Sequence, residues 1–447
     1  MDATQHEDWL RSLRREFHQR PEPAWREFWT TARIVTELES LGVDDVAVGP
    51  EILTGEDRLG LPDEEELDEW LDRARDLGVD GAILEQLAGG YTGAIATVER
   101  GEGPTIALRV DIDGLPRAEA TDESHVPVAE GFESQNEGNM HACGHDAHIT
   151  FGLGVIRAIQ DSDFAGTLKV IFQPAEEVVG GAKAVARSGH LDDVDALLAV
   201  HVGLDHPTGE VVAGVDGFLA VSHIDARFSG EAAHAGGKPN AGRNAVQAMA
   251  TAIQNLYAIP RHEDGATRIN AGRVGGGNAS NIIPEGAFIV GEVRGETTEL
   301  KEYMKEEAHR VIHNAAAMHD CEVEISGGSE APSAQSDEAV VEHVARAAGD
   351  NGGVTSLVRR DDLGGSEDAT YLMRGVQERG GVAGYVAVGT DHPGGHHTAT
   401  FDVDEASLVI GVEVLTDAIL ALAADESIRG GDVEPGDEVD TGAAAEN

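Results

Sequence analysis

TIALRVDID at residues 105–113 is a run of β-branched and apolar residues that ends in a pair of aspartates. Two similar runs follow along the chain, TLKVIFQ at 167–173 and ALLAVHV at 196–202. Between the first two, residues 147–160 have the spacing of a helix. Short apolar strands that alternate with helices are typical of a sheet with both faces covered. The sequence therefore predicts an α/β fold.

A different pattern occupies residues 218–328. The elements it predicts are, in order, a strand within VSHIDARFSG from Val221, a helix at 241–257, strands at 267–274 and 286–294, a helix at 299–319 and a strand at 321–326. This β-α-β-β-α-β order is that of a ferredoxin-like unit. We expect it to be a lid or dimerisation domain inserted in a larger catalytic domain.

The catalytic domain is then formed by two separate parts of the chain. The first part is residues 1–217, with an acidic insert at 51–90, and the second is residues 329–424. From 425 to 447 the chain consists mainly of Gly, Glu, Asp and Ala, and we expect this tail to be disordered.

The charge balance excludes one class of function. The chain has 82 acidic and 32 basic residues and a net charge of −50, which repels nucleic acid phosphate. The acidic residues are spread along the whole chain, and only five of the basic residues are lysine. This composition is typical of a surface adapted to high salt, where screening removes self-repulsion.

The location of the protein is predicted from what the sequence lacks. We find no run close to the ~18–20 apolar residues of a membrane span and no apolar signal-peptide stretch near the start. The two cysteines, Cys143 and Cys321, are too few for a disulfide framework. We therefore expect a cytoplasmic protein without a membrane or nucleic acid partner.

Polar side chains follow each of the three apolar strands. Asp111 and Asp113 end the first strand, Glu176 and Glu177 follow the second, and His201 lies in the third. In open α/β sheets, ligands bind outside the carboxyl ends of the strands. We therefore expect these side chains to converge on one crevice.

The densest cluster of metal-binding residue types is MHACGHDAH, which begins at Met140. Cys143 and His145 are spaced so that a loop entering a helix can direct both at one metal ion, although a Cys-x-His pair alone is a weak signal. The remaining polar residues are expected to support these ligands or the fold: His141, Asp146 and His148. Asp146 could hold a ligand histidine through its second nitrogen.

Two further segments carry candidate residues. Glu176 and Glu177 are adjacent, so one can bind metal while the other acts as a general base, or both can belong to an acidic turn. Near the end of the chain His392, His396 and His397 lie within six positions, and at least one of them is expected to be a ligand. No GxSxG, P-loop or GxGxxG motif is present.

A set of motifs occurs in a fixed order along the chain. They are RREFHQRPE, LRVDIDGLP, HACGHDAH, IFQPAEE, AAHAGGKP, NIIPEG, GSEDAT and HHTATFDVDE. Together they resemble the aminoacylase–carboxypeptidase family of co-catalytic metallohydrolases, in its amidohydrolase branch with a cysteine ligand. The resemblance implies that the sheet of the catalytic domain is a zinc-peptidase-like mixed sheet. Within that branch EFWTTAR, GGYTGAIATVERG, GRNAVQAMATA and GTDHPGGHH are similar to the aminobenzoyl-glutamate hydrolase A-subunit group.

The resemblance implies a site with two divalent transition-metal ions, zinc, manganese or cobalt. Cys143 would bridge them, with His145 and Glu177 completing one ion and His201 and His397 the other. The family spacing, which places the ligand four residues before Phe401, favours His397 over His396. The resemblance also implies roles for three catalytic residues: Glu176 as general base, Asp113 as supporting aspartate and His234 as the group that polarises the scissile carbonyl.

The same resemblance implies how substrate is held. Asn281 and Arg294 match positions that bind the substrate carboxylate, and arginine can do so through two parallel hydrogen bonds. A surface salt bridge is the alternative for Arg294, which ends a predicted strand. His234 often reaches into a partner's active site in this family, which implies a homodimer, or a heterodimer with a paralogue.

We therefore expect a metal-dependent amidohydrolase that cleaves the amide bond of N-acyl or N-aroyl amino acids. One alternative is a dipeptidase or carboxypeptidase on the same scaffold. A second alternative is a non-catalytic subunit that pairs with a catalytic paralogue.

Overall fold

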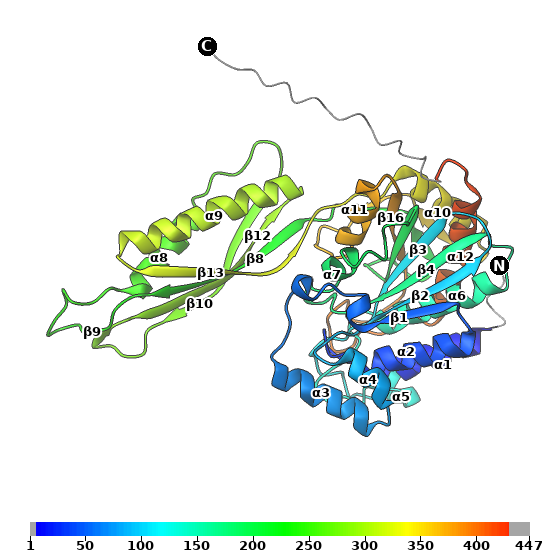
Figure 1. Cartoon of the computed structure of the whole chain (residues 1–447), viewed down its shortest axis with the longest axis horizontal. Coiled ribbons are helices and arrows are strands. Elements are labelled where there is room, and N and C mark those ends of the chain that lie inside the picture. The colour runs from blue at the N-terminus through cyan, green and yellow to red at the C-terminus, as the bar shows by residue number, and fades with distance from the viewer. Residues whose placement is uncertain (1–5, 429–447) are drawn as a thin grey trace, which may run out of the picture.

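The largest β-sheet lies in one unit of the molecule (Figure 1), and the computed structural model describes residues 6–428. Its strands, in spatial order, are β1 (Asp45–Val48), β2 (Ala94–Arg100), β4 (Gly166–Gln173), β3 (Thr105–Asp111), β5 (Ala196–Val202), β16 (Val382–Val388), β6 (Glu210–Val212) and β14 (Ser356–Val358). The central strands β4, β3, β5 and β16 run parallel, whereas β1, β2 and β6 pair antiparallel with a neighbour. The sheet is mixed, which confirms the predicted α/β class.

Helices cover both faces of this sheet. The helices of this unit are α1 (Glu7–His18), α2 (Phe28–Leu41), α3 (Glu64–Asp76), α4 (Gly81–Leu87), α5 (Val126–Glu130), α6 (His145–Gln160), α7 (Ala182–Ala186), α10 (Glu338–Asp350), α11 (Thr370–Glu378) and α12 (Ala406–Ala424), of which α2, α6, α10, α11 and α12 contact the sheet. Helix α6 lies close to the sheet because Gly152 has no side chain, and a Cβ there would come within 2.8 Å of the Phe172 ring. Side chains alternate between the two faces along a strand. The Arg109 side chain points to the face opposite α6, where it contacts Asp368 just before α11.

One helix differs from the expectation that no segment could span a membrane. Among residues 6–428, α12 is the one helix long and apolar enough, and 61% of the window that meets this test is buried inside the protein. It packs against α6 and α10 as part of the main core. Core helices with this composition pass the same test, so α12 alone is weak evidence for a membrane span.

The smaller unit contains a four-stranded antiparallel sheet in the order β10-β12-β8-β13. Its elements are β8 (Ala220–Ser229), β9 (Ala233–His234), α8 (Ala245–Leu256), β10 (Thr267–Gly276), β11 (Ile282–Ile283), β12 (Gly286–Gly295), α9 (Thr298–Met318) and β13 (Glu322–Ala331). Apart from the short β9 and β11, this is the predicted β-α-β-β-α-β order. Helices α8 and α9 bury one face of the sheet around a second hydrophobic core.

The local boundaries differ from the predictions in a few places. Helix α2 begins at Phe28, three residues after Trp25, which has a left-handed φ of 66°. The acidic insert 51–90 contains helices α3 and α4. The boundary expected at 217/218 lies between β7 (Val215–Asp216), which pairs with β15 (Asp361–Asp362), and β8, whereas 328/329 lies inside β13. From residue 429 onward the predicted disordered tail lies outside the described residues.

Candidate active site

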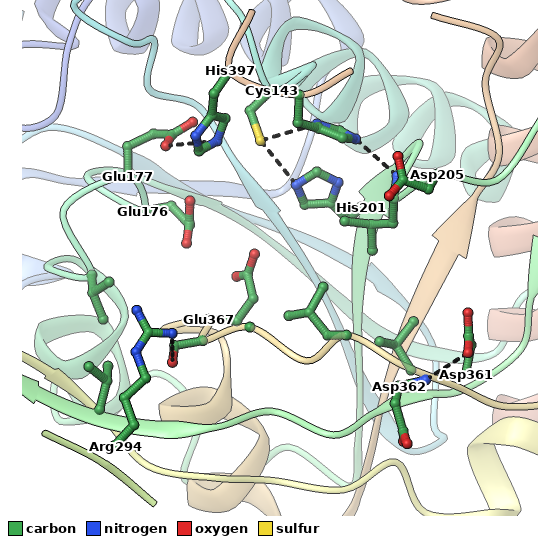
Figure 2. A pocket seen from close by; sticks show the side chains of 18 of the residues that line it. Cys143, Glu176, Glu177, His201, Asp205, Arg294, Asp361, Asp362, Glu367 and His397 are labelled. Atoms are coloured by element: carbon green, nitrogen blue, oxygen red, sulfur yellow. Dashed lines mark hydrogen bonds and ion pairs between the residues drawn. The ribbon is translucent and has the colours of Figure 1, made fainter. Parts of the chain in front are cut away.

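The carboxyl ends of β3, β4 and β5 meet at one edge of the large sheet, where the sequence predicted a crevice. A pocket of about 630 Å³ opens there, and its lining includes Cys143, Glu176, Glu177, His201 and His397. Figure 2 shows Cys143 between His201 and His397, with the carboxylates of Glu176 and Glu177 nearby. Parallel strands bring their ends to the same edge, so residues far apart in sequence become neighbours.

Asp113 fixes the positions of both glutamates. Its two carboxylate oxygens accept hydrogen bonds from the backbone N–H groups of Glu176, at 3.1 Å, and Glu177, at 3.0 Å. The preceding residue, Ala175, has a left-handed φ of 58° and donates its N–H to the Glu27 carboxylate at 2.8 Å. Strained backbone of this kind persists where the surroundings hold it, and here it directs two adjacent carboxylates into the pocket.

Two buried histidines share a group of donor atoms with Cys143, and the Nε2 atom of one of them, His201, lies 3.4 Å from the Cys143 sulfur. His145 donates from Nδ1 to the Asp113 carbonyl at 2.8 Å, and His201 donates from Nδ1 to the Val202 carbonyl at 2.7 Å. These bonds fix the tautomer and leave the lone pair of each Nε2 available. His145 Nε2 and Glu177 Oε1 are buried and have no hydrogen-bond partner among the described residues.

Cys143 is common to two groups of donor atoms that are close enough to share an ion. One group is Cys143, His145 and His201, and the other is Cys143, Glu177 and His397; the donor atoms in each lie within 4.8 Å of one another. The resemblance pairs His145 with Glu177 and His201 with His397, and His145 and Glu177 also lie together in a third group of donor atoms, with Glu176. Thiolate, imidazole and carboxylate groups are ligands that suit zinc and similar ions. The buried donor atoms without a hydrogen-bond partner are therefore suited to bind such an ion.

The choice between His396 and His397 follows from their contacts. His396 accepts the Leu204 N–H at Nε2 (2.9 Å), so its neutral ring carries the proton on Nδ1, which lies 3.5 Å from Cys143 Sγ, and neither nitrogen has a free lone pair. The His397 Nε2 lies 3.6 Å from a carboxylate oxygen of Glu177. His397 is also held at a left-handed φ of 59°. His397 therefore has the more available lone pair.

Two residues of the Cys-x-His cluster have other tasks. Asp146 binds the buried Arg14 (2.9 Å) and His18 (2.8 Å), so the expectation that it holds a ligand histidine is wrong. The Asp113 carbonyl performs that task for His145. His148 bonds Asp111 through Nδ1 and accepts the Val202 N–H at Nε2, which leaves no nitrogen for a metal.

Burial and mutual repulsion dominate the electrostatics of the site. Burial, with Glu367 and Glu177 nearby, raises the pKa of Glu176 well above its ordinary value. Burial also raises the pKa of Glu177 to about 8 and, together with Glu177, that of the Cys143 thiol. Although burial disfavours its charged form, Asp111 and Asp113 raise the pKa of His145 to about 10. A bound cation reverses this logic, because it favours carboxylate, thiolate and neutral imidazole.

Glu367 belongs to the pocket but was not singled out from the sequence. Its carboxylate is buried, lies 3.8 Å from Arg109, and is close enough to Asp111 and Glu176 to share an ion with them. Burial raises the pKa of Glu367 to about 7, although Arg109 lowers it. In Figure 2 the carboxylates of Glu176 and Glu367 point into the same hollow. The motif GSEDAT was the signal that could have identified it.

The three predicted residues of the smaller unit lie in different places. Arg294 on β12 lines the pocket and donates to Glu292 (2.8 and 3.2 Å) and to Ser366 (3.5 Å). His234 and Asn281 are exposed at the β9–β11 pairing, and the described lining of the pocket does not include them. Strand β9 lies at the end of the smaller unit far from the large sheet (Figure 1). Within one chain, the structure therefore brings Arg294 to the site but not His234 or Asn281.

Known proteins resemble this chain over most of its length. The model of Peptidase family M20/M25/M40 matches residues 107–421. An "Indole-3-acetyl-aspartic acid hydrolase" from Enterobacter agglomerans is 42% identical over 90% of this chain and 93% of its own. The A subunit of p-aminobenzoyl-glutamate hydrolase from Escherichia coli (strain K12) is 42% identical over 91% and 94%. A crystal structure of an "Aminobenzoyl-glutamate utilization protein" from Klebsiella pneumoniae is 36% identical, with a TM-score of 0.79 over 93% of this chain and 97% of that one.

Proposed function

The chain belongs to peptidase family M20/M25/M40, and on this premise we propose that it is a metal-dependent amidohydrolase that cleaves the amide bond of N-acyl or N-aroyl amino acids. The observation that carries this proposal is the pair of donor groups that share Cys143, with the Glu176 carboxylate beside them. A base next to a pair of cations is an arrangement that can hydrolyse an unactivated amide.

Two divalent ions are assigned to the donor groups described above. Cys143 would belong to both sets, with His145 and His201 in one and Glu177 and His397 in the other. When bound, the ions polarise the amide carbonyl and lower the pKa of a water molecule. Zinc, manganese and cobalt all accept this mixture of sulfur, nitrogen and oxygen donors, so cellular supply decides between them.

The protein residues handle the proton and hold the reacting groups. Glu176 accepts a proton from the attacking water and returns it to the leaving amine, because its carboxylate faces the pocket and is not part of either donor group around Cys143. Asp113 fixes the backbone of Glu176 and Glu177 through hydrogen bonds to its two carboxylate oxygens. Arg294 binds the α-carboxylate of the substrate in exchange for its contact with Glu292.

His234 and Asn281 complete the site only when they come from elsewhere. Both are exposed at the far end of the smaller unit, so a second copy of the chain, or a paralogue, has to present them to the pocket. His234 would then stabilise the oxyanion that forms at the scissile carbonyl. The Escherichia coli relative is named as one subunit of its enzyme, which fits either a homodimer or a heterodimer here.

The two alternatives, a dipeptidase and a non-catalytic subunit, differ from the proposed amidohydrolase in the substrate and the site residues that they require. A dipeptidase would need to accept a free α-amino group on the acyl side, whereas the two relatives are named for aromatic acyl conjugates of aspartate and glutamate. The role of a non-catalytic partner is disfavoured because every donor and the base are present in this chain. We further propose that the enzyme works in a salt-rich cytoplasm, on the basis of its net charge of −50 and its two free cysteines.

The test is an activity assay of the purified chain alone in molar salt. A panel of 4-aminobenzoyl-glutamate, N-acetyl amino acids and dipeptides is assayed after loading with zinc, manganese or cobalt. We expect hydrolysis of the acylated substrates and its loss with the Glu176→Gln variant. Faster cleavage of dipeptides would establish the peptidase alternative, and activity only after addition of a paralogue would establish the non-catalytic role.

A further inference from the structure

Two arginines face each other across neighbouring strands of the smaller sheet. Arg268 on β10 pairs directly with Arg294 on β12. Side chains of directly paired residues lie on the same face, with Cβ atoms about 4.5–5.5 Å apart, and like charges in such a pair are destabilising. In a chain with 82 acidic residues and only 32 basic ones, this juxtaposition of two positive charges calls for an explanation.

The two arginines are neutralised unequally. Arg294 donates to the Glu292 carboxylate, which lies two residues away on the same strand. Within residues 6–428 Arg268 forms no ion pair, and its side chain is exposed to solvent. Its positive charge is therefore available to a ligand.

Both arginines line one hollow of about 450 Å³, together with Arg261. The charged groups in its lining are three guanidinium groups and the Glu292 carboxylate, so it carries a net charge of +2. Arg294 also lines the metal-binding pocket, so it stands between that pocket and the hollow as a lining residue of both. Arg268 lines the hollow but not the metal-binding pocket.

We propose that Arg268 is a specificity residue that binds the side-chain carboxylate of an acidic amino acid, while Arg294 binds its α-carboxylate. This inference rests on the proposed function and deepens it, because it restricts the amine half of the substrate to a dicarboxylic amino acid. The charge of −2 on such a leaving group matches the charge of the hollow. An arginine that holds a carboxylate donates charge-assisted hydrogen bonds, which a neutral amide cannot replace.

The test measures binding without turnover. The Glu176→Gln variant, loaded with metal, is titrated by calorimetry with 4-aminobenzoyl-glutamate and with 4-aminobenzoyl-glutamine, which differ in one charge. We expect the glutamate ligand to bind about 10- to 100-fold more tightly, as a charged hydrogen bond implies. Adding Arg268→Gln should reduce this ratio to about 2 or less and leave the affinity for the glutamine ligand unchanged.

Three further variants make the result specific. Arg273→Gln removes the same charge from the same strand but outside the hollow, and should keep the full ratio. Arg294→Gln should weaken both ligands equally, because both carry an α-carboxylate. Arg268→Lys retains the charge and should give an intermediate ratio, which guards against a folding defect in Arg268→Gln.

Failure of the inference differs from failure of the proposed function. If the wild-type enzyme hydrolyses both ligands and the ratio persists in Arg268→Gln, Arg268 does not read the side chain and the inference alone is overturned. If neither ligand binds and no N-acyl amino acid is hydrolysed, the proposed function falls and the inference falls with it.

Discussion

A carboxylate oxygen of Asp113 accepts a hydrogen bond of 3.0 Å from the backbone N–H of Glu177, while the carbonyl of Asp113 accepts one of 2.8 Å from His145. A single residue therefore orients a proposed ligand from the loop after β4 and another from the start of α6. Its second carboxylate oxygen does the same for the backbone of Glu176. Asp113 is a positioning residue, and the effects of replacing it should spread over the whole site.

Replacing Asp113 by Asn tests this arrangement. The amide NH₂ group would face one of the two backbone N–H groups. One hydrogen bond would then be lost, and a repulsive contact between two donors would take its place. We expect activity and metal affinity to fall about 10- to 100-fold, as for other residues that orient ligands. Asp205→Asn is the matched control, since Asp205 lines the pocket without contacting the two glutamates. Kinetics and elemental analysis provide the readout, and equal effects of the two substitutions would contradict the role of Asp113.

Glu176 and Glu177 should respond differently to the same substitution. Glu176→Gln removes the base but no ligand, so we expect about two ions per chain and a loss of activity of at least about 100-fold. Glu177→Gln removes a ligand, so metal content should fall as well. Elemental analysis of both proteins checks this, with circular dichroism to establish folding. Loss of metal from a folded Glu176→Gln variant would reverse the assignment.

Cys143 is the residue common to both donor groups. Replacing it by Ser substitutes a hard hydroxyl for a soft thiolate, and because the bridge serves both ions, both should bind more weakly. Competition with a chromogenic chelator measures the two affinities. Cys321→Ser is the control, since Cys321 lies in the core of the smaller unit. Weakening of a single ion would argue against bridging.

Glu330 joins the two units through three of the five lysines of the chain. It lies 3.1 Å from Lys183 of α7, 3.0 Å from Lys305 and 3.8 Å from Lys301 of α9. Although burial opposes it, the contacts with Lys305 and Lys183 lower the pKa of Glu330 to about 2. A lowered pKa stabilises the folded state above the ordinary value of 4.5, and this contribution disappears as the pH falls toward 2.

Glu330→Gln should therefore lower the melting temperature at pH 7 by about 1–2 °C, in keeping with a partly exposed ion pair. The difference from the wild type should shrink as the pH falls below 4.5. Melting curves between pH 3 and pH 7 measure it, with Glu324→Gln as a control on the same strand. A difference that grows on acidification would contradict the lowered pKa.

Salt should stabilise the enzyme. The folded state concentrates a net charge of −50, which the unfolded chain can spread out. In molar salt the Debye length falls to about 3 Å and most of this repulsion disappears. We expect melting temperature and activity to rise together from dilute buffer to molar salt, whereas a chelator should abolish activity at every salt concentration. A melting temperature that is flat or falls with salt would overturn the salt adaptation and leave the metal site untouched.

The large sheet and the polar residues at its edge could be predicted from the sequence, because the patterns that indicate them are local. The three apolar strands carry their polar residues at or just after their carboxyl ends, and a parallel sheet necessarily brings those ends together. Asp113, Glu176, Glu177 and His201 could thus be placed at one edge before the fold was known. The order of elements in 218–328 likewise predicted the smaller sheet.

The remaining features depend on contacts that no local pattern encodes. Glu367 reaches the pocket because the loop before α11 passes beside Arg109, and Asp146 turns away from the site because Arg14 and His18 bind it from α1. The pairing of Arg268 with Arg294 is a matter of strand register. A shift of one residue would put the two side chains on opposite faces of the sheet, and hydrogen bonding between strands fixes that register only when the chain has folded.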